Sequence, residues 1–288
     1  MDPALDAEWI ARMSTAEITQ LRRNSGGRSV MFKLTFADGR RAVWKPEQNQ
    51  SGGSATNYVS EIAAHHIDRI LGLRRVAPVS GRAIGLSRLR AAMRGDTEIL
   101  GRIQREVIAR EGQVRGATIA WLDGTLGSAI PPQAWTGQTR GRPVAPQMLE
   151  RVREWTDLVV FDFLIDNTDR WSGGNIRTLG VGGPLIFLDN GAGFNQWRAE
   201  HDRVGMDILQ YVCRFKRTTI AQLRAMGPDA PEGQRLGARL RAAMARDVLG
   251  AETLGDVHYR ALDFRVGRLL QHVQRCEQRF GADRVTDI

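Results

Sequence analysis

The sequence contains very little lysine. Of its 41 lysines and arginines, only three are lysines: Lys33, Lys45 and Lys216. Arginine therefore carries almost all of the positive charge. Because a compact ammonium group differs chemically from a planar guanidinium group, a lysine that survives in such a chain marks a position where lysine itself is needed. This bias makes Lys45, within "AVWKP", a candidate functional residue.

Long apolar runs and a cysteine framework are also absent. No stretch approaches about 18 consecutive apolar residues, and the opening "MDPALDAEWIARM" has neither the basic region nor the apolar core of a signal peptide. The two cysteines, Cys213 and Cys276, are too few for a disulfide framework and form no C-x-x-C pair for zinc. We therefore expect a soluble cytoplasmic protein with no membrane partner.

Basic runs of the kind that bind nucleic acid are missing as well. The net charge is +9, but the basic residues are spread along the chain, with no basic helix or aromatic platform. A solvated basic surface is therefore the simpler interpretation, and nucleic acid is not the expected partner. Such a surface would suit an acidic peptide or an anionic glycan.

Sequence patterning predicts a mainly β first part. "SVMFKLTFADGRRAVWKP" alternates and turns at Asp38-Gly39, which indicates a β-hairpin with Lys45 near the end of its second strand. "NYVSEIAAHHIDRILGL" has the spacing of a helix that ends at Gly72, with Glu61 on its more polar face. "VAPVSGRAIGL" then predicts another strand.

The second half reads as mainly helical. "WTDLVVFDFLIDNTDR" predicts an apolar helix that ends just before Asp169, and "GPLIFLDNG" predicts a short buried strand that ends at Asp189. The last helix is the clearest element, because an apolar stripe runs from Leu262 to Phe280 before Gly281 stops it.

These elements predict an α+β chain in two lobes. Residues 1–120 would form a small, mainly β N-lobe with one helix, and residues 121–146 a connector with a hinge and a loop. Residues 147–288 would form a larger, mainly α C-lobe that carries the two aspartate loops.

The two aspartates suggest a reaction. Asp169 and Asp189 each follow a buried segment and precede a tight turn, so they can converge on one cleft. Phosphoryl transfer uses one aspartate to orient the acceptor hydroxyl and take its proton, and another to hold the metal ions on the nucleotide phosphates.

The first lobe supplies the remaining parts. Phosphoryl transfer also uses a strand lysine, steadied by a helix glutamate, to neutralise the α and β phosphates, and Lys45 and Glu61 have those positions. The turn "NSGGRS", with Gly26 and Gly27, can lie over phosphates through its backbone, and Lys33 on the next strand is a further candidate for nucleotide binding.

The sequence resembles the secretory-pathway kinases, a family that includes the Golgi casein kinase, the xylose kinase and the Four-jointed kinase. The resemblance lies in "AVWKP", "NYVSEIAAHHIDRILGLRRVAPVSGR", "GTLGSAIPP", "WTDLVVFDFLIDNTDR", "LIFLDNGAGF", "CRFKRTT" and "ALDFRVGRLLQHVQRCEQRFG". It implies an atypical protein-kinase-like fold. The arginine-rich composition and compact length indicate a bacterial relative.

The resemblance also implies roles for single residues. Asp169 would be the catalytic base, Asp189 a metal ligand and Lys45 the phosphate-binding lysine. Glu61 matches the helix glutamate, which in this family reaches a metal ion as well as the lysine.

The motif after the base departs from the family pattern. The family has Glu or Asn five residues after the base, where this chain has Gly174, and Asn175 stands one place later. Two glycines can absorb the extra residue and leave Asn175 as the second metal ligand. Trp171 also replaces a histidine of the casein-kinase branch.

The family commonly pairs a cysteine of the "CRFKRTT" block with one in the last helix. Cys213 and Cys276 occupy these places, so the resemblance implies a disulfide and with it the option of export. Two buried thiols would fit a cytoplasmic chain equally well. Both alternatives stay open at this point.

The leading hypothesis is a phosphotransferase with an alcohol-group acceptor. It would use ATP with Mg²⁺ or Mn²⁺ to phosphorylate a hydroxyl of a protein (Ser/Thr) or a glycan. One alternative is a nucleotide-binding pseudokinase that acts as a regulatory partner, which the shifted position of Asn175 motivates. Another is an AMP transferase. The identity of the acceptor, ATP versus GTP and the oligomeric state are open.

Overall fold

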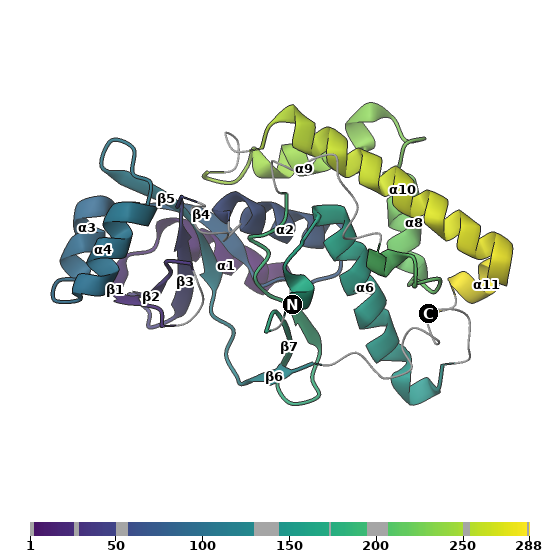
Figure 1. The fold of residues 1–288 in the computed structure, drawn as a ribbon, viewed down its shortest axis with the longest axis horizontal. Helices are drawn as coiled ribbons and strands as arrows, with labels where there is room; N and C mark the ends of the chain where they lie inside the picture. Colours follow the sequence, from purple (N-terminus) through teal and green to yellow (C-terminus); the bar gives the residue numbers. More distant parts are fainter. Residues whose placement is uncertain are drawn as a thin grey trace.

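The chain forms a β-rich part and a helical part that meet around one buried helix. The computed structural model describes residues 3–25, 29–49, 57–129, 144–172, 174–194, 207–249, 254–286 and 288. In Figure 1 the β-rich part lies on the left and the long helices on the right, with helix α2 (Tyr58–Ile70) between them. The predicted two-lobed α+β class is therefore confirmed, while the lobe boundaries stay a prediction.

The N-terminal sheet has five strands in the order β1-β2-β3-β5-β4, and each neighbouring pair is antiparallel. The strands are β1 (Ile18–Arg23), β2 (Phe32–Phe36), β3 (Arg41–Pro46), β4 (Val79–Gly85) and β5 (Gln113–Ala120). The predicted hairpin is β2–β3, and Gly39 at its turn has a φ of 81°. Lys45 lies near the end of β3, in register with Ala117 of β5.

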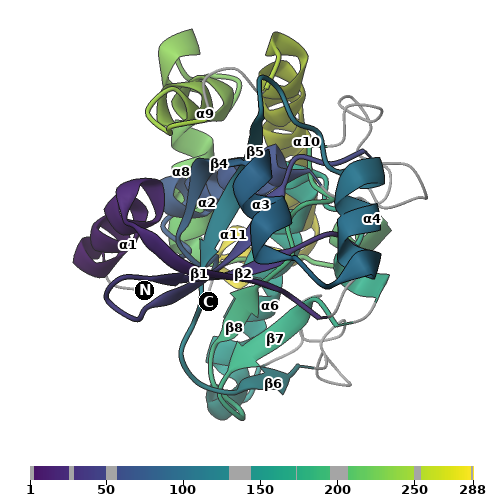
Figure 2. The same cartoon turned by 90° about the vertical axis from the view of Figure 1, so that its left-hand side faces the viewer.

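This part holds more helices than the single one predicted. The additional helices are α1 (Pro3–Thr15), α3 (Leu86–Ala92) and α4 (Thr97–Glu106). Figure 2 shows α1 at one side of the sheet and α3 and α4 in front of it. Strand β1 was also not predicted. Among the described side chains, Met13 is the one buried apolar residue of α1, and Ile18 is the one buried apolar residue of β1. Neither segment therefore carries a clear apolar pattern.

Helix α2 is buried on its polar face as well as on its apolar one. The side-chain oxygen of Asn57 caps its start by accepting a hydrogen bond from the backbone N–H of Val59 at 2.9 Å. Glu61 is 2% exposed and Asp68 0% exposed, so the face that looks polar in the sequence is directed into the protein. The chain leaves the helix at Gly72, whose φ is 64°.

A second, small sheet joins the connector to the C-terminal part. It consists of β6 (Leu126–Ser128), β7 (Ile176–Leu179) and β8 (Leu185–Phe187), all antiparallel. Strand β5, the last strand of the N-terminal sheet along the chain, ends at Ala120, and β6 of the small sheet is the next strand. The chain therefore crosses between the two parts just after Ala120.

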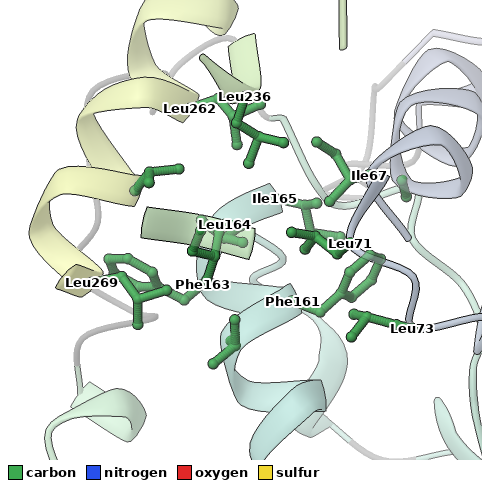
Figure 3. Packing of buried hydrophobic residues seen from close by; sticks show 14 of the residues in the cluster. Ile67, Leu71, Leu73, Phe161, Phe163, Leu164, Ile165, Leu236, Leu262 and Leu269 are labelled. Atoms are coloured by element: carbon green, nitrogen blue, oxygen red, sulfur yellow. The ribbon is translucent and has the colours of Figure 1, made fainter. Parts of the chain in front are cut away.

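The C-terminal part is helical, as predicted. Its helices are α6 (Leu149–Ile165), α8 (Arg217–Ala225), α9 (Leu236–Met244), α10 (Asp256–Phe280) and α11 (Ala282–Val285), with short 3-10 turns at Pro146–Met148, Arg170–Ser172 and Glu232–Gln234. In Figure 3, apolar side chains of α6 pack between α2 on one side and α10 on the other. None of the helices in the described ranges could span a membrane, since none is both long and apolar enough.

A disulfide closes the C-terminal helices against the segment that precedes α8. Cys213 and Cys276 are bonded, with their Cα atoms 5.3 Å apart and a separation of 63 positions in the sequence. Of the two alternatives that the sequence leaves open, the structure therefore has the disulfide.

Removing this disulfide should destabilise the fold. Because a cross-link over a long loop restricts the unfolded chain, we expect Cys213→Ala/Cys276→Ala to lose roughly 2–4 kcal/mol of unfolding free energy. Urea unfolding measures the difference. A reducing agent should lower the stability of the wild type and leave the double variant unchanged; equal stability of the two oxidised proteins would contradict the expectation.

A buried carboxyl group on α6 gives a pH-dependent prediction. Asp157 is 5% exposed and accepts a hydrogen bond from the Thr219 hydroxyl of α8 at 2.9 Å. Burial raises the pKa of Asp157 from its ordinary 3.8 to about 6, although Lys216 and Thr219 oppose the shift. The folded state thus binds this proton more tightly than the unfolded state, so the contribution of Asp157 is most favourable below about pH 4 and is lost as the pH rises through about 6.

Asp157→Asn should remove this pH dependence, because the amide oxygen can still accept the Thr219 hydrogen bond while carrying no charge. Above pH 6 the variant should gain roughly 1–3 kcal/mol relative to the wild type, and the gain should shrink toward pH 4. Urea unfolding of both proteins across this range measures the difference. A stability difference that stays constant with pH would count against the assignment.

Candidate nucleotide and phosphoryl-transfer site

Lys45 lies at the centre of the site, between two carboxylates. Its Nζ atom is 2.5 Å from Oε1 of Glu61 and 2.7 Å from Oδ1 of Asp189. The side chains of Lys45 and Glu61 are 6% and 2% exposed, whereas that of Asp189 is 45% exposed. Burial alone would lower the pKa of Lys45, but the two carboxylates outweigh it and raise the pKa above its ordinary value. The lysine is therefore a fixed positive charge beneath an accessible aspartate.

Glu61 also connects α2 to the loop that carries Asp189. Its second oxygen, Oε2, accepts a hydrogen bond from the backbone N–H of Asn190 at 3.2 Å. Next to it on α2, the Ser60 hydroxyl donates to the carbonyl oxygen of Gly193 at 2.5 Å. These bonds hold the start of the helix against the loop, so Glu61 fixes both the lysine and the backbone beside the aspartate.

Asp189 adopts a backbone conformation that is unusual for a residue other than glycine. It follows β8 and has a φ of 54°, in the left-handed region. This turn places its carboxylate on Lys45 and the next N–H group on Glu61. Such a conformation costs roughly 1–3 kcal/mol and persists where the surroundings hold it, often at functional sites.

A cavity opens over these charges. Its volume is ≈ 270 Å³, and it contains both an apolar region and a charged end. The apolar region includes Val43, Val79, Ile119, Leu126 and Phe187, and the charged end includes Lys45, Glu61 and Asp189. Trp121 and Leu122, where the chain crosses between the two parts, also line it. A flat apolar ring fits one end of such a cavity, and a phosphate with a cation fits the other.

Asp169 and Asn175 lie together in the loop that follows α6. The backbone N–H of Asp169 donates to Oδ1 of Asn167 at 3.1 Å. Nδ2 of Asn175 donates to the backbone carbonyl of Asp169 at 3.1 Å and lies 3.4 Å from Oδ2 of the same residue. The side chain of Asn175 thus reaches Asp169 despite the one-residue shift that the sequence shows.

Other predicted residues lie outside this cluster. Lys33 is not one of the described residues that line the cavity, and its Nζ atom lies 5.3 Å from the centre of the Trp121 ring. Its role in nucleotide binding stays a prediction. Gly26 and Gly27 fall outside the residues that the structure describes. Trp171 stacks on Trp155 with ring centroids 6.0 Å apart.

Arg170, which is 0% exposed and follows Asp169 directly, was not among the residues predicted from the sequence. The signal available was an arginine beside the predicted base, with Asp162 eight positions earlier on the preceding helix. Because the chain is rich in arginine, the presence of one more arginine at this position did not mark it as a functional residue. Only the fold shows that this one is buried among the loops of the site.

The chain belongs to the family described as "Golgi casein kinase, C-terminal, Fam20", which it matches over residues 2–100 and 143–285. The two matched segments include both halves of the site, the strand lysine with the helix glutamate and the two aspartate loops. The resemblance identified from the sequence is therefore confirmed.

Among curated proteins, the chain is similar to three human proteins. It is 26% identical to extracellular serine/threonine protein kinase FAM20C, over 99% of this chain and 56% of that protein. The identity is 29% with Four-jointed box protein 1, over 96% and 67%, and 23% with glycosaminoglycan xylosylkinase, over 95% and 75%. The chain thus spans little more than half the length of FAM20C.

The fold is likewise that of a solved member of the family. The crystal structure of the Golgi casein kinase with Mn/ADP bound superposes with a TM-score of 0.73 at 19% identity, covering 98% of this chain and 78% of that one.

The expectation of a cytoplasmic protein is wrong. The family is described as a Golgi kinase family and the FAM20C relative as extracellular, which places the relatives in the secretory pathway. The error arose from giving weight to the composition of the first residues of the sequence and to the small number of cysteines. The bonded pair Cys213–Cys276 agrees with the correction, because disulfides persist in oxidising compartments.

Proposed function

We propose that this protein is a kinase that transfers the γ-phosphoryl group of ATP to a hydroxyl group. One observation carries the proposal: Lys45 is held between Glu61 and Asp189 at the charged end of an otherwise apolar cavity. This geometry places a fixed cation beside an accessible carboxylate where the phosphates of a bound nucleotide would lie. The Mn/ADP complex of a family member with the same fold supports this reading.

The oxygen ligands of the site fit a divalent cation. Asp189 and Glu61 offer carboxylate oxygens and Asn175 an amide oxygen, and hard cations such as Mg²⁺ and Mn²⁺ prefer oxygen ligands. The 45% exposure of the Asp189 side chain leaves it accessible. Asp189 would hold the cation, with Glu61 and Asn175 as further ligands. When bound, the cation neutralises charge on the phosphates and on the leaving group.

Asp169 would act as the catalytic base. The acceptor oxygen forms a bond to the γ-phosphorus as the bond from this phosphorus to the β,γ-bridging oxygen breaks, and ADP leaves with the electron pair. The acceptor proton passes to the carboxylate of Asp169. The hydrogen bond from the Asp169 backbone N–H to the Asn167 side chain and the amide of Asn175 keep Asp169 in place, and Lys45 stabilises the phosphate charge.

The acceptor class is a hydroxyl of a protein or of a glycan. The relatives support both, since one is named a serine/threonine protein kinase and another a glycosaminoglycan xylosylkinase. The net charge of +9 further favours an acidic acceptor, because a basic surface raises the encounter rate with anionic partners.

Labelled nucleotides test the proposal against the alternatives. With Mn²⁺ and a mixture of acidic peptides and glycans, label from γ-labelled ATP should appear in an acceptor or as phosphate, and label from α-labelled ATP should remain in ADP. Transfer of the α label would instead show an AMP transferase. Stabilisation by nucleotide with neither transfer nor hydrolysis would show a pseudokinase.

A further inference from the structure

Arg170 is a buried arginine whose guanidinium group contacts three separate segments. On α6, Nε lies 3.1 and 3.0 Å from the two carboxylate oxygens of Asp162, and Nη2 lies 3.1 Å from one of them. Nη2 also donates to Oδ1 of Asn190 at 2.5 Å. Nη1 donates to the carbonyl oxygen of Asn175 at 3.1 Å and to that of Leu188.

These contacts surround both aspartates of the proposed site. Arg170 is the chain neighbour of Asp169, so its backbone and the base move together. Leu188 and Asn190, which accept its hydrogen bonds, are the residues on either side of Asp189. One side chain therefore joins the loop of the base to the loop of the metal ligand.

We propose that Arg170 is a positioning residue that sets the geometry between Asp169 and Asp189 by holding both loops to Asp162 on α6. The proposal rests on the proposed function and deepens it. Arg170 itself would touch neither nucleotide nor acceptor.

The buried pair of Arg170 and Asp162 is not expected to add much to the free energy of unfolding. Burying an ion pair costs several kcal/mol per ion in desolvation, and apolar residues of similar volume often replace a buried pair without loss. What arginine adds is a planar fork of five N–H donors in fixed directions, and here each nitrogen donates to at least one acceptor. The benefit is therefore expected in the geometry of the loops.

Arg170→Lys separates geometry from charge. The lysine keeps a positive charge for Asp162, so the buried carboxylate is not left without a cation, but a single ammonium cannot reach both loops. We expect the turnover of γ-labelled ATP to fall 10- to 100-fold, and the Mn²⁺ concentration for half-maximal stabilisation by ADP to rise about tenfold, the range for losing a group that orients metal ligands.

Arg265→Lys is the matched control. Arg265 is also a buried arginine, 2% exposed, whose Nε donates to the carbonyl oxygen of Leu164 on α6 at 2.7 Å. It ties α10 to the same helix, so its replacement should lower the melting temperature while leaving the Mn²⁺ requirement and KM for ATP unchanged.

A second variant keeps the test valid if Arg170→Lys does not fold. Asp162→Leu/Arg170→Met removes both buried charges, so the protein should remain folded while turnover and Mn²⁺ affinity fall as in the lysine variant. Wild-type turnover and Mn²⁺ requirement in either folded variant would overturn the proposal.

The two proposals fail in different ways. If the wild-type protein binds ADP with Mn²⁺ but transfers no phosphate, the proposed kinase activity is refuted. The Mn²⁺ titration would still decide the role of Arg170. A wild type that binds neither ligand would overturn both.

Discussion

Asp189→Asn should abolish phosphoryl transfer. The substitution keeps the shape of the side chain but removes the charge that would hold the metal, and of the two carboxylates beside Lys45 it leaves only Glu61. Losing a preorganised electrostatic group of this kind costs about 10²–10³ in turnover, and metal ligation adds to that loss. The measurement is the initial rate of γ-label release or transfer at saturating ATP and Mn²⁺.

Binding should fail together with turnover in this variant. Stabilisation by ADP should lose most of its dependence on Mn²⁺, because the accessible carboxylate would be gone. Asp229→Asn, at an exposed position after α8, serves as the control and should behave as the wild type. If Asp189→Asn kept more than a tenth of the activity, Asp189 would not be the metal ligand.

Asp169→Asn should lower turnover while leaving nucleotide binding intact. An amide cannot take the acceptor proton, and general-base catalysis contributes about 10²–10⁴ in rate. The amide nearly matches the carboxylate in shape, so the contacts with Asn167 and Asn175 can persist. We therefore expect kcat to fall by that factor, with KM for ATP and the Mn²⁺-dependent stabilisation by ADP close to wild type.

The contrast between the two aspartate variants carries the assignment of roles. Loss of binding and catalysis at Asp189 with loss of catalysis alone at Asp169 would match a metal ligand and a base. Equal effects on binding at both positions would show that Asp169 also holds the metal and would remove the distinction drawn here.

The elements with strong patterns could be predicted from the sequence. The β2–β3 hairpin, α2 and α10 each combine a regular apolar period with a clear turn or glycine stop, so local signals and the fold agree. Helix α1 and strand β1 were not predicted, because they bury few apolar side chains; β1 owes its place to pairing with β2, and α1 to its contacts with the sheet.

The candidate residues could be named from the sequence, but their arrangement could not. Lys45, Glu61 and Asp189 do come together. The left-handed backbone of Asp189 was not predicted, because the sequence indicates a tight turn after β8 but does not show which of its residues adopts this conformation. The burial of Arg170 depends on how α6 and the two loops that follow it fold back on one another, so the apolar period of a single segment could not reveal it.

The most direct test of the account follows γ-labelled ATP with the purified wild-type protein and Mn²⁺, beside Asp189→Asn under the same conditions. The account predicts metal-dependent transfer or release of the γ-phosphoryl group by the wild type, and a loss of at least about 10² in the variant. Equal rates in both proteins, or a wild type that binds Mn²⁺ and ATP and leaves the γ-phosphate in place, would contradict the claim that this site performs phosphoryl transfer.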